Sequence, residues 1–245
     1  MMKQRSKSNT TKIDFGIIAA GEGSRLKAEG IQISKPMIPI NGKPLIEWII
    51  MPALNSGVEK INCIINEESN DLKAYLNKYT YSHKINLLVK NTKSSFHSLK
   101  EISQHLTPPF LISTTDSIFK EDEFISFMEF GINVSNADVV VASTNFIDDE
   151  KPLYINLNED GYVIDFYDSA KDYEFVTGGL YLFKREIKKE IKEAMESDTK
   201  RLRNFLRFLI RKEFRIQAYR FSKIIDVDHI SDIEAAESFL NEVRE

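Results

Sequence analysis

The sequence predicts an α/β fold, a three-layer sandwich in which helices cover both faces of a mixed, mainly parallel sheet. Short apolar runs alternate with amphipathic helical patterns through the first 145 residues. Strand–helix alternation of this kind forms right-handed crossovers and parallel strands. After residue 150 the pattern changes to short runs of alternating polarity around Asp160-Gly161, which is a hairpin signal. This second part predicts a small antiparallel lid over 150–183.

The first part divides into alternating strands and helices. Apolar runs predict strands near 13–19, 60–65, 85–89, 109–114 and 138–143. Helical patterns lie near 44–56, 69–81, 93–106 and 121–130, and Pro52 is expected to weaken the first of them. In the second part, Val176 to Phe183 predicts a strand and 199–211 a helix. The last helix is expected to begin near Ser231, with a capping box to Glu234.

Composition narrows the class of protein. The chain has 245 residues, a formal net charge of −4 and a pI of about 5.7, which argues against bulk binding of nucleic acid. Its one cysteine, Cys63, lies in an apolar run and is expected to be a buried thiol. No long apolar stretch predicts a membrane span. Residues 1–12 are polar and basic, so we expect a disordered tail in the cytoplasm and a single domain over 13–245.

The segment that carries most chemical information is 15–40. An apolar strand ends in Ala20-Gly21-Glu22-Gly23-Ser24-Arg25, and Lys35-Pro36 follows on the same loop. Glycines after a buried strand let backbone N–H groups approach an anion, and the Arg and Lys add positive charge. No Lys-Ser or Lys-Thr follows the glycines at P-loop spacing, and Leu26 stands where a dinucleotide fingerprint has its third glycine. The segment predicts a site for a nucleoside triphosphate.

This segment resembles the signature of the sugar-1-phosphate nucleotidyltransferase (NTP-transferase) family, roughly G-x-G-[ST]-R-L-x-P-L-T-x-x-x-P-K-P. Arg25, Leu26, Lys35 and Pro36 fall on the family spacing, whereas Ala28-Glu29-Gly30 and Ser34 depart from it. The resemblance implies a Rossmann-like fold of the nucleotide-diphospho-sugar transferase type. It also implies that 20–24 (Ala20, Gly21, Glu22, Gly23, Ser24) cradles the nucleotide phosphates, and that Arg25 and Lys35 are catalytic.

Two acidic segments extend the resemblance. Asp116 follows the predicted strand 109–114, and ligands in α/β sheets bind outside the carboxyl ends of strands. Ile224 to Asp232 resembles the family's W-x-D-[VI]-[GD]-T-P-E-D-L. The resemblance implies that Asp116 and Asp226 hold Mg²⁺, with Asp228 as an alternate ligand to Asp226. Taken alone, Asp116 is equally consistent with capping a turn or the helix near 121.

Further residues are assigned to the two substrates. Near the nucleotide we expect Ser95, Ser98 and Thr115, while Ser94 is expected to cap a helix in which His97 is partly exposed. Gly178-Gly179 resembles the family strand that lines the sugar pocket. Asp168 stands for the Glu of the family's Glu-Lys-Pro motif, although Ser169 does not replace its Lys. Asp168, Gly178 and Gly179 are therefore the expected acceptor contacts. The face Arg203, Arg207 and Arg211 is expected to be solvated.

The resemblance implies transfer of a nucleotidyl group from an NTP to a sugar 1-phosphate, which releases pyrophosphate and forms an NDP-sugar. Two alternatives remain open. One is a cytidylyltransferase that acts on a non-sugar phosphate such as phosphocholine. The other is a catalytically inactive regulatory module that binds nucleotide sugars. The implied partners are an NTP, a phosphorylated small molecule and Mg²⁺, with no nucleic acid and no membrane, and the protein is expected to be a monomer or homodimer.

Overall fold

The computed structural model describes residues 12–147, 150–169 and 174–242. Apart from Lys12, the tail predicted for 1–12 lies outside the described residues. The parallel part of the main sheet consists of β1 (Asp14–Ala19), β4 (Ile61–Ile65), β5 (Ile85–Val89) and β6 (Phe110–Thr114). β1 lies between β4 and β6, and all these pairings are parallel. Cys63 is buried in β4, as predicted, and burial raises the pKa of its thiol to about 12.

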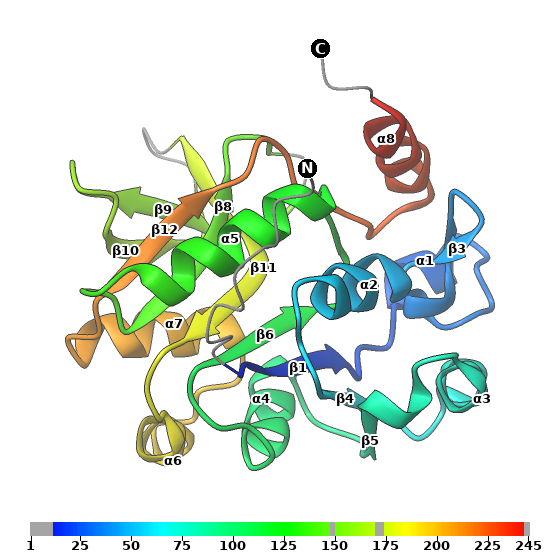
Figure 1. Cartoon of the computed structure of the whole chain (residues 1–245), viewed down its shortest axis with the longest axis horizontal. Coiled ribbons are helices and arrows are strands. Elements are labelled where there is room, and N and C mark those ends of the chain that lie inside the picture. The colour runs from blue at the N-terminus through cyan, green and yellow to red at the C-terminus, as the bar shows by residue number, and fades with distance from the viewer. Residues whose placement is uncertain (1–11, 148–149, 170–173, 243–245) are drawn as a thin grey trace, which may run out of the picture.

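The second half of the chain continues the same sheet in antiparallel fashion (Figure 1). Its strands are β8 (Val139–Thr144), β9 (Tyr154–Leu157), β10 (Val163–Tyr167), β11 (Phe175–Phe183) and β12 (Ile216–Arg220). β11 pairs with β6, β8 and β9, and β12 runs parallel to β8. The small antiparallel part predicted from 150–183 is therefore present, and β11 joins it to the main sheet.

Helices cover both faces of the sheet, as the sequence predicts. One core cluster packs α2 (Glu47–Asn55), α3 (Asn70–Lys78) and α5 (Glu121–Asn133) against one face. A second cluster packs α4 (Ser95–Ser103), α6 (Lys188–Glu196) and α7 (Leu202–Arg211) against the other. The residues alternate as in a sheet buried on both faces, since Ile17 belongs to the first cluster and Ile18 to the second. Pro52 lies inside α2 without ending it.

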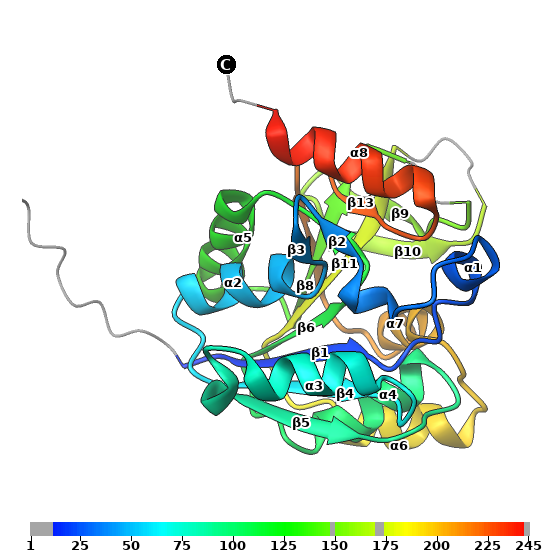
Figure 2. The same cartoon turned by 90° about the vertical axis from the view of Figure 1, so that its right-hand side faces the viewer.

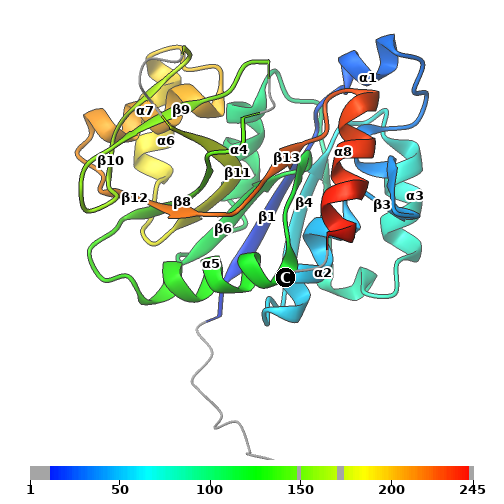
Figure 3. The same cartoon turned by 90° about the horizontal axis from the view of Figure 1, so that it is seen from above.

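A third core cluster joins the start of the chain to its end. It packs Leu26 of α1 (Ser24–Ala28) and the short pair β2 (Pro39–Ile40) and β3 (Lys43–Pro44) near α8 (Ile230–Asn241). A two-stranded pairing of β7 (Ser117–Ile118) with β13 (Ile225–Asp226) belongs to the same cluster. Figure 3 shows α8 beside β3 and near α1. Two short 3₁₀ turns, η1 (Lys35–Met37) and η2 (Ser82–Lys84), complete the described elements.

One expected helix start differs from the structure, and one helix was not expected. The last helix begins at Ile230 with His229 as its N-cap, so the predicted capping box of Ser231 and Glu234 is wrong. Asp232 does this work instead, because its carboxylate accepts the backbone N–H groups of Asp228 at 2.8 Å and His229 at 2.6 Å. Helix α6 was not predicted from the sequence.

Candidate active site

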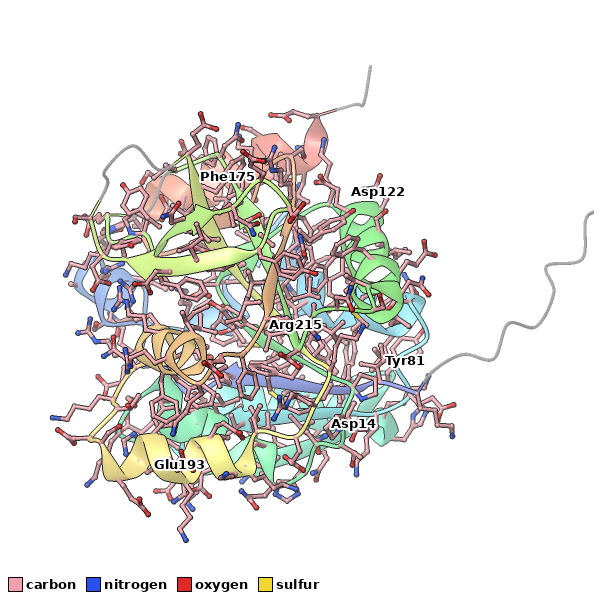
Figure 4. The ribbon with its side chains drawn as sticks, turned by 90° about the vertical axis from the view of Figure 1, so that its left-hand side faces the viewer. Asp14, Tyr81, Asp122, Phe175, Glu193 and Arg215 are labelled. Atoms are coloured by element: carbon pink, nitrogen blue, oxygen red, sulfur yellow. The ribbon has the colours of Figure 1, made fainter. Side chains whose placement is uncertain are left out.

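The carboxyl end of β1 opens into a cavity. Asp14, at the amino end of β1, is labelled in Figure 4. Figure 2 is the opposite view and shows α1, which follows the carboxyl end of β1. The turn between β1 and α1 lines a cavity of about 730 Å³, which we call the first cavity. Gly23 has φ +61°, and a Cβ there would lie 3.1 Å from the Cβ of Lys35. The turn therefore requires glycine because it passes close to the second half of the signature loop.

A second cavity of about 510 Å³ lies against the first. The two share several lining residues, namely Arg25, Ser94, Ser95, Thr114, Asp116, Arg201 and Asp228. The residues that line only the second cavity come from β11, β13, the start of α7 and the segment before β9. The two cavities thus place one ligand-sized space beside the glycine turn and another beside the antiparallel part of the sheet.

A chain of ion pairs lies where the cavities meet. The Nζ of Lys35 lies 3.2 Å from Oδ2 of Asp116 and 2.6 Å from Oδ1 of Asp228. The other oxygen of Asp228 is 2.5 Å from Nη1 of Arg25. Both cations predicted from the signature therefore converge on Asp228, which comes from the opposite end of the sequence.

The ion pairs keep these groups charged. Burial alone would lower the pKa of Lys35, but the charges of Asp116 and Asp228 outweigh it and raise the pKa to about 12. Burial would likewise raise the pKa of Asp116, but the charge of Lys35 and hydrogen bonds hold it below its usual value. Both shifts favour the charged forms of Lys35 and Asp116.

One predicted metal ligand, Asp226, lies on β13, and the other, Asp116, directly precedes the strand β7 that pairs with it. Asp226 is opposite Ser117 in the β13–β7 pairing, and its carboxylate accepts a hydrogen bond from the Ser117 hydroxyl at 2.7 Å. The next residue, Val227, donates its N–H to the carbonyl of Asp116 at 2.8 Å. Asp116 and Asp226 both line the second cavity. The fold thus brings these two segments together, as expected from their resemblance to the family.

The donor set suits a hard cation that is shared with substrate phosphates. Carboxylate oxygens are ligands that Mg²⁺ prefers, and it commonly takes only one or two of them beside phosphate oxygens. Among the described residues no group of three or more His, Cys, Asp or Glu side chains forms a closed metal site. Both oxygens of Asp228, the alternate ligand, already contact cations.

The start of α4 contributes hydroxyl groups to the first cavity. Ser94 caps the helix by accepting the N–H of His97 at 3.4 Å, as predicted, and His97 is half-buried. The hydroxyl of Ser95 accepts the N–H of Leu202, and that of Ser98 bonds to Thr92 at 2.6 Å. Ser95, Ser98 and Thr115 all line the first cavity, so their predicted contact with the nucleotide stays a prediction that the geometry allows.

The signature loop departs from the family pattern at residues that tether it. Glu29 pairs with His229 and accepts the N–H of Ile230 at 2.8 Å, which ties the end of α1 to the start of α8. Ser34 donates both its N–H and its hydroxyl to Asp71 on α3, each at 2.8 Å. Sequence reasoning missed these tethers, because neither partner is near in sequence.

The predicted acceptor glycines are required by the protein's own packing. Gly179 has φ +70°, and a Cβ there would lie 2.4 Å from the Ser117 hydroxyl and 2.6 Å from that of Thr114. A Cβ on Gly178 would lie 2.1 Å from a methyl group of Ile224. Gly179 lines the second cavity, whereas Gly178 lines a separate small one. These glycines were expected to contact the acceptor. In this structure the groups that lie close to them are neighbouring side chains of the protein.

The arginines of α7 differ from the expectation. Arg203 donates to Asp168 and to the carbonyl of Lys151, both at 2.9 Å. Arg207 lies 2.9 Å from the other oxygen of Asp168 and donates to the carbonyl of Phe166 at 3.0 Å. The predicted solvated face is therefore wrong for these two residues and holds only for Arg211, which is exposed. The hydrogen bond from Arg207, with that from Arg203, lowers the pKa of Asp168.

The sequence did not point to every charged residue of the second cavity. Lys151 and Arg201 line it, although neither belongs to a recognisable motif. Their positions follow from the loop before β9 and from the start of α7, which the hydrogen bond from Arg203 to the Lys151 carbonyl holds together.

The fold and site define an α/β protein with a glycine turn, two ion-paired cations and their partner carboxylates at one edge of its sheet. The chain belongs to the nucleotidyl transferase family, whose model matches residues 16–242. This confirms the resemblance drawn from the signature residues.

Relatives and solved structures agree with this membership. The bifunctional protein GlmU of Methanococcus maripaludis strain C5 is 28% identical over 182 residues, covering 71% of this chain and 41% of GlmU. The chain thus spans about two fifths of that relative's length. D-glycero-alpha-D-manno-heptose 1-phosphate guanylyltransferase of Campylobacter jejuni is 25% identical over 173 residues, covering 70% of this chain and 76% of the relative.

Two solved structures show the same fold. A putative glucose-1-phosphate thymidylyltransferase from Bacillus anthracis superposes with a TM-score of 0.80 at 16% identity, covering 95% of this chain and 97% of the other. The CTP:phosphocholine cytidylyltransferase LicC of Streptococcus pneumoniae gives 0.73 at 20% identity, covering 94% and 100%. These likenesses confirm the Rossmann-like fold with its mixed sheet. Among the described helices, none has both the length and the apolar character needed to cross a bilayer.

Proposed function

We propose that this protein is a sugar-1-phosphate nucleotidyltransferase, which transfers a nucleotidyl group from an NTP to a sugar 1-phosphate. The observation that carries the proposal is the position of Lys35, which lines the first cavity and is held between Asp116 and Asp228, two residues that line both cavities. Such a cation lies where the phosphates of two substrates would meet. Family membership and the guanylyltransferase relative support the same reaction class.

The reaction needs little covalent work from the protein. An oxygen of the acceptor phosphate forms a bond to the α-phosphorus of the NTP. The bond between that phosphorus and the bridging oxygen to the β-phosphorus breaks, and pyrophosphate leaves with the electron pair. Catalysis of such a step rests on holding the two phosphates in line and on neutralising charge.

The cations of the site have distinct places in this scheme. The backbone of 20–24 cradles the triphosphate, Arg25 neutralises the β- and γ-phosphates, and Lys35 contacts the α-phosphate and the acceptor phosphate. Both cations contact Asp228 in the structure. A guanidinium has five N–H donors, so Arg25 can bind the triphosphate while it keeps its ion pair with Asp228. Arg201 lines both cavities and supplies positive charge at their junction.

Asp116 and Asp226 would hold a magnesium ion, which supplies charge neutralisation at the phosphate oxygens when it is bound. The protein's own contribution is to place both carboxylates on the rim of the second cavity. We further assign the protein to the cytoplasm, where nucleoside triphosphates and magnesium ions are available.

Transfer to phosphocholine is the second candidate, since LicC shares the fold. The described lining of the second cavity does not favour it. A quaternary ammonium group is commonly bound by several aromatic rings, and Tyr181 is the one aromatic residue among the described lining residues.

Release of pyrophosphate tests the proposal. The purified protein is incubated with Mg²⁺, each of the common NTPs and a panel of sugar 1-phosphates and phosphocholine. We expect pyrophosphate release with at least one sugar 1-phosphate and a matching NDP-sugar in the products. Product formation with phosphocholine alone would favour the cytidylyltransferase, and nucleotide binding without pyrophosphate from any pair would favour the inactive regulatory module.

A further inference from the structure

Ser34 directly precedes Lys35 in the signature loop and has the backbone geometry of a proline. Its φ is −63° and its ψ is 142°. A proline ring fixes φ at about −65°, and ψ is about +145° in extended polyproline segments. No ring restricts φ in a serine, so another contact must hold this conformation. The family signature has proline at this place, and the chain keeps the conformation without that residue.

The backbone N–H and the hydroxyl of Ser34 both bind one carboxylate. The N–H donates to Oδ2 of Asp71 and the hydroxyl donates to Oδ1, each at 2.8 Å. Burial alone would raise the pKa of Asp71, but the two bonds from Ser34, with further backbone N–H groups, hold it below its usual value. Hydrogen bonds to an ionised acceptor are stronger than those between neutral groups. The N–H bond requires a residue other than proline, because proline has no N–H.

The helix that carries Asp71 is part of the packed core. Asp71 lies in the first turn of α3, where a carboxylate is also favoured by the helix dipole. The next residue, Leu72, is fully buried in the core cluster that packs α3 against the sheet, and Leu76 one turn further is buried there as well. The signature loop is therefore tied to a helix that packing holds in place.

The contact between Ser34 and Asp71 acts on Lys35 and not on a substrate. Neither residue of the contact is among the described residues that line the first or the second cavity. The carbonyl of Ser34 accepts the N–H of Met37 at 2.8 Å, which closes the 3₁₀ turn that begins at Lys35. On its other side, the Cβ of Lys35 lies against Gly23 of the glycine turn. The conformation at Ser34 therefore sets where the Lys35 side chain leaves the loop.

We propose that Asp71 is a positioning residue for Lys35. Its carboxylate holds Ser34 in the conformation that a proline would impose. The Nζ of Lys35 is thereby kept 3.2 Å from Asp116 and 2.6 Å from Asp228. The inference rests on the proposed function, in which Lys35 contacts the phosphates of both substrates. Loss of the contact misplaces this charge, and a small misplacement of a positioned group lowers the rate strongly.

A double-mutant cycle with proline tests the proposal. Pyrophosphate release by the full chain is measured with Mg²⁺ and the NTP and acceptor that react fastest. Asp71→Ala is expected to lower kcat about tenfold or more and to change KM for the NTP less than threefold, because Arg25 and the glycine turn still hold the triphosphate. Ser34→Pro should stay within threefold of the wild type, because the ring replaces the contact. The double variant should be as active as Ser34→Pro alone.

Two further variants control for the stability of α3. Glu190→Ala removes an acidic residue from the first turn of α6, a helix that also has 9 residues, and should leave kcat unchanged. Asp71→Asn keeps one acceptor oxygen for the two donors of Ser34, so its loss of kcat should be smaller than that of Asp71→Ala. If Asp71→Ala does not fold, the cycle is measured with Asp71→Asn.

Chemical labelling of Lys35 gives a readout that does not need turnover. Brief acetylation is followed by mass spectrometry of the peptide that contains Lys35, with the exposed Lys60 as internal reference. The Lys35 side chain is only 11% exposed, so it should react slowly in the wild type. Its rate relative to Lys60 is expected to rise at least threefold in Asp71→Ala. The rate should return to that of the wild type when Ser34→Pro is added.

The outcomes separate this proposal from the proposed function. An equal loss of kcat for Asp71→Ala with serine and with proline at position 34 would overturn the positioning role, because Asp71 would then serve only α3. A tenfold loss in Ser34→Pro alone would also overturn it, as would unchanged labelling of Lys35 in Asp71→Ala. If the labelling follows the expected pattern but no NTP and acceptor yield pyrophosphate, the positioning role is supported and the proposed function fails.

Discussion

At the scale of single residues, the Asp228 carboxylate contacts both cations of the signature segment. Arg25 and Lys35 are ten positions apart in the sequence, and Asp228 contacts both of them. The side chain of Lys35 is only 11% exposed, against 34% for Arg25. Lys35 is therefore part of the protein's internal ion network, whereas Arg25 is the more exposed of the two cations.

This difference leads to a prediction for alanine variants. Arg25→Ala and Lys35→Ala should each lower kcat/KM by about two orders of magnitude or more, because each removes a charge that stabilises the transition state. Steady-state pyrophosphate release measures the effect, with Lys60→Ala as an exposed control. Lys35→Ala should also lower the urea midpoint of unfolding, because Asp116 and Asp228 lose their shared cation, whereas Arg25→Ala should leave it nearly unchanged. Full activity in either variant would contradict the assignment.

The ionisation of Lys35 gives a prediction about pH. Its pKa is raised to about 12, so the stabilisation it provides is fully present below its unfolded value and is lost as pH rises through the folded one. Between pH 6 and 10, kcat/KM should therefore show no inflection caused by Lys35. Asp228→Asn removes one of the two negative charges that raise the pKa of Lys35. The loss of activity at alkaline pH should therefore begin at a lower pH in this variant. An unchanged pH profile in that variant would show that Asp228 does not set this pKa.

At the scale of elements, β11 packs closely against the turn that joins the end of β6 to the start of β7. No space is left there for a side chain at Gly179. The Thr114 and Ser117 hydroxyls face Gly179, and Ser117 also donates to Asp226. A change at Gly179 therefore reaches the segment that carries Asp116. The sequence pattern suggests that Gly179→Val weakens acceptor binding alone, but the packing gives a reason for nucleotide binding to fall as well.

A pair of alanine variants separates backbone strain from the steric clash. Gly57 has φ +94° and open space around its Cβ position, whereas Gly179 combines φ +70° with contacts below 3 Å. Gly57→Ala should cost about 1 kcal/mol of unfolding free energy from strain alone, and Gly179→Ala clearly more. Chemical denaturation measures both, and NTP binding should weaken only in Gly179→Ala. Equal destabilisation of the two variants would mean that the clash relaxes freely.

At the scale of the whole molecule, the fold closes the site by bringing the end of the chain back to its beginning. Strand β13 pairs with β7, and α8 packs in the same cluster as α1. Asp116 and Asp226 meet on the second cavity only because of this return.

Asp116 and Asp226, the expected magnesium ligands, come from segments that only the complete fold brings together. Asp116→Asn and Asp226→Asn should each abolish magnesium-dependent turnover and leave a folded protein, because each replacement keeps the shape of the side chain and one acceptor oxygen while it removes the charge. Thermal unfolding with NTP and Mg²⁺ provides the second readout. An NTP at 100 times its Kd should add about 2.7 kcal/mol to the wild type. In both variants the part of this gain that depends on magnesium should vanish. If Asp226→Asn keeps it, Asp226 is not a metal ligand and Asp228 takes its place.

By itself the sequence determined the layer order, most strands of the main sheet and most helices, because burial on two faces leaves a periodic pattern that short windows contain. It did not predict β12 at the edge of that sheet. It also located the glycine turn, Arg25, Lys35 and the two acidic segments, since these are local motifs. The helix cap at His229, the tether of Glu29 and the pairing of Asp168 with Arg203 were decided only by the tertiary structure. The physical reason is the same for these three contacts. The partner of a side chain depends on which elements pack together, and that packing is a property of the whole chain rather than of any segment.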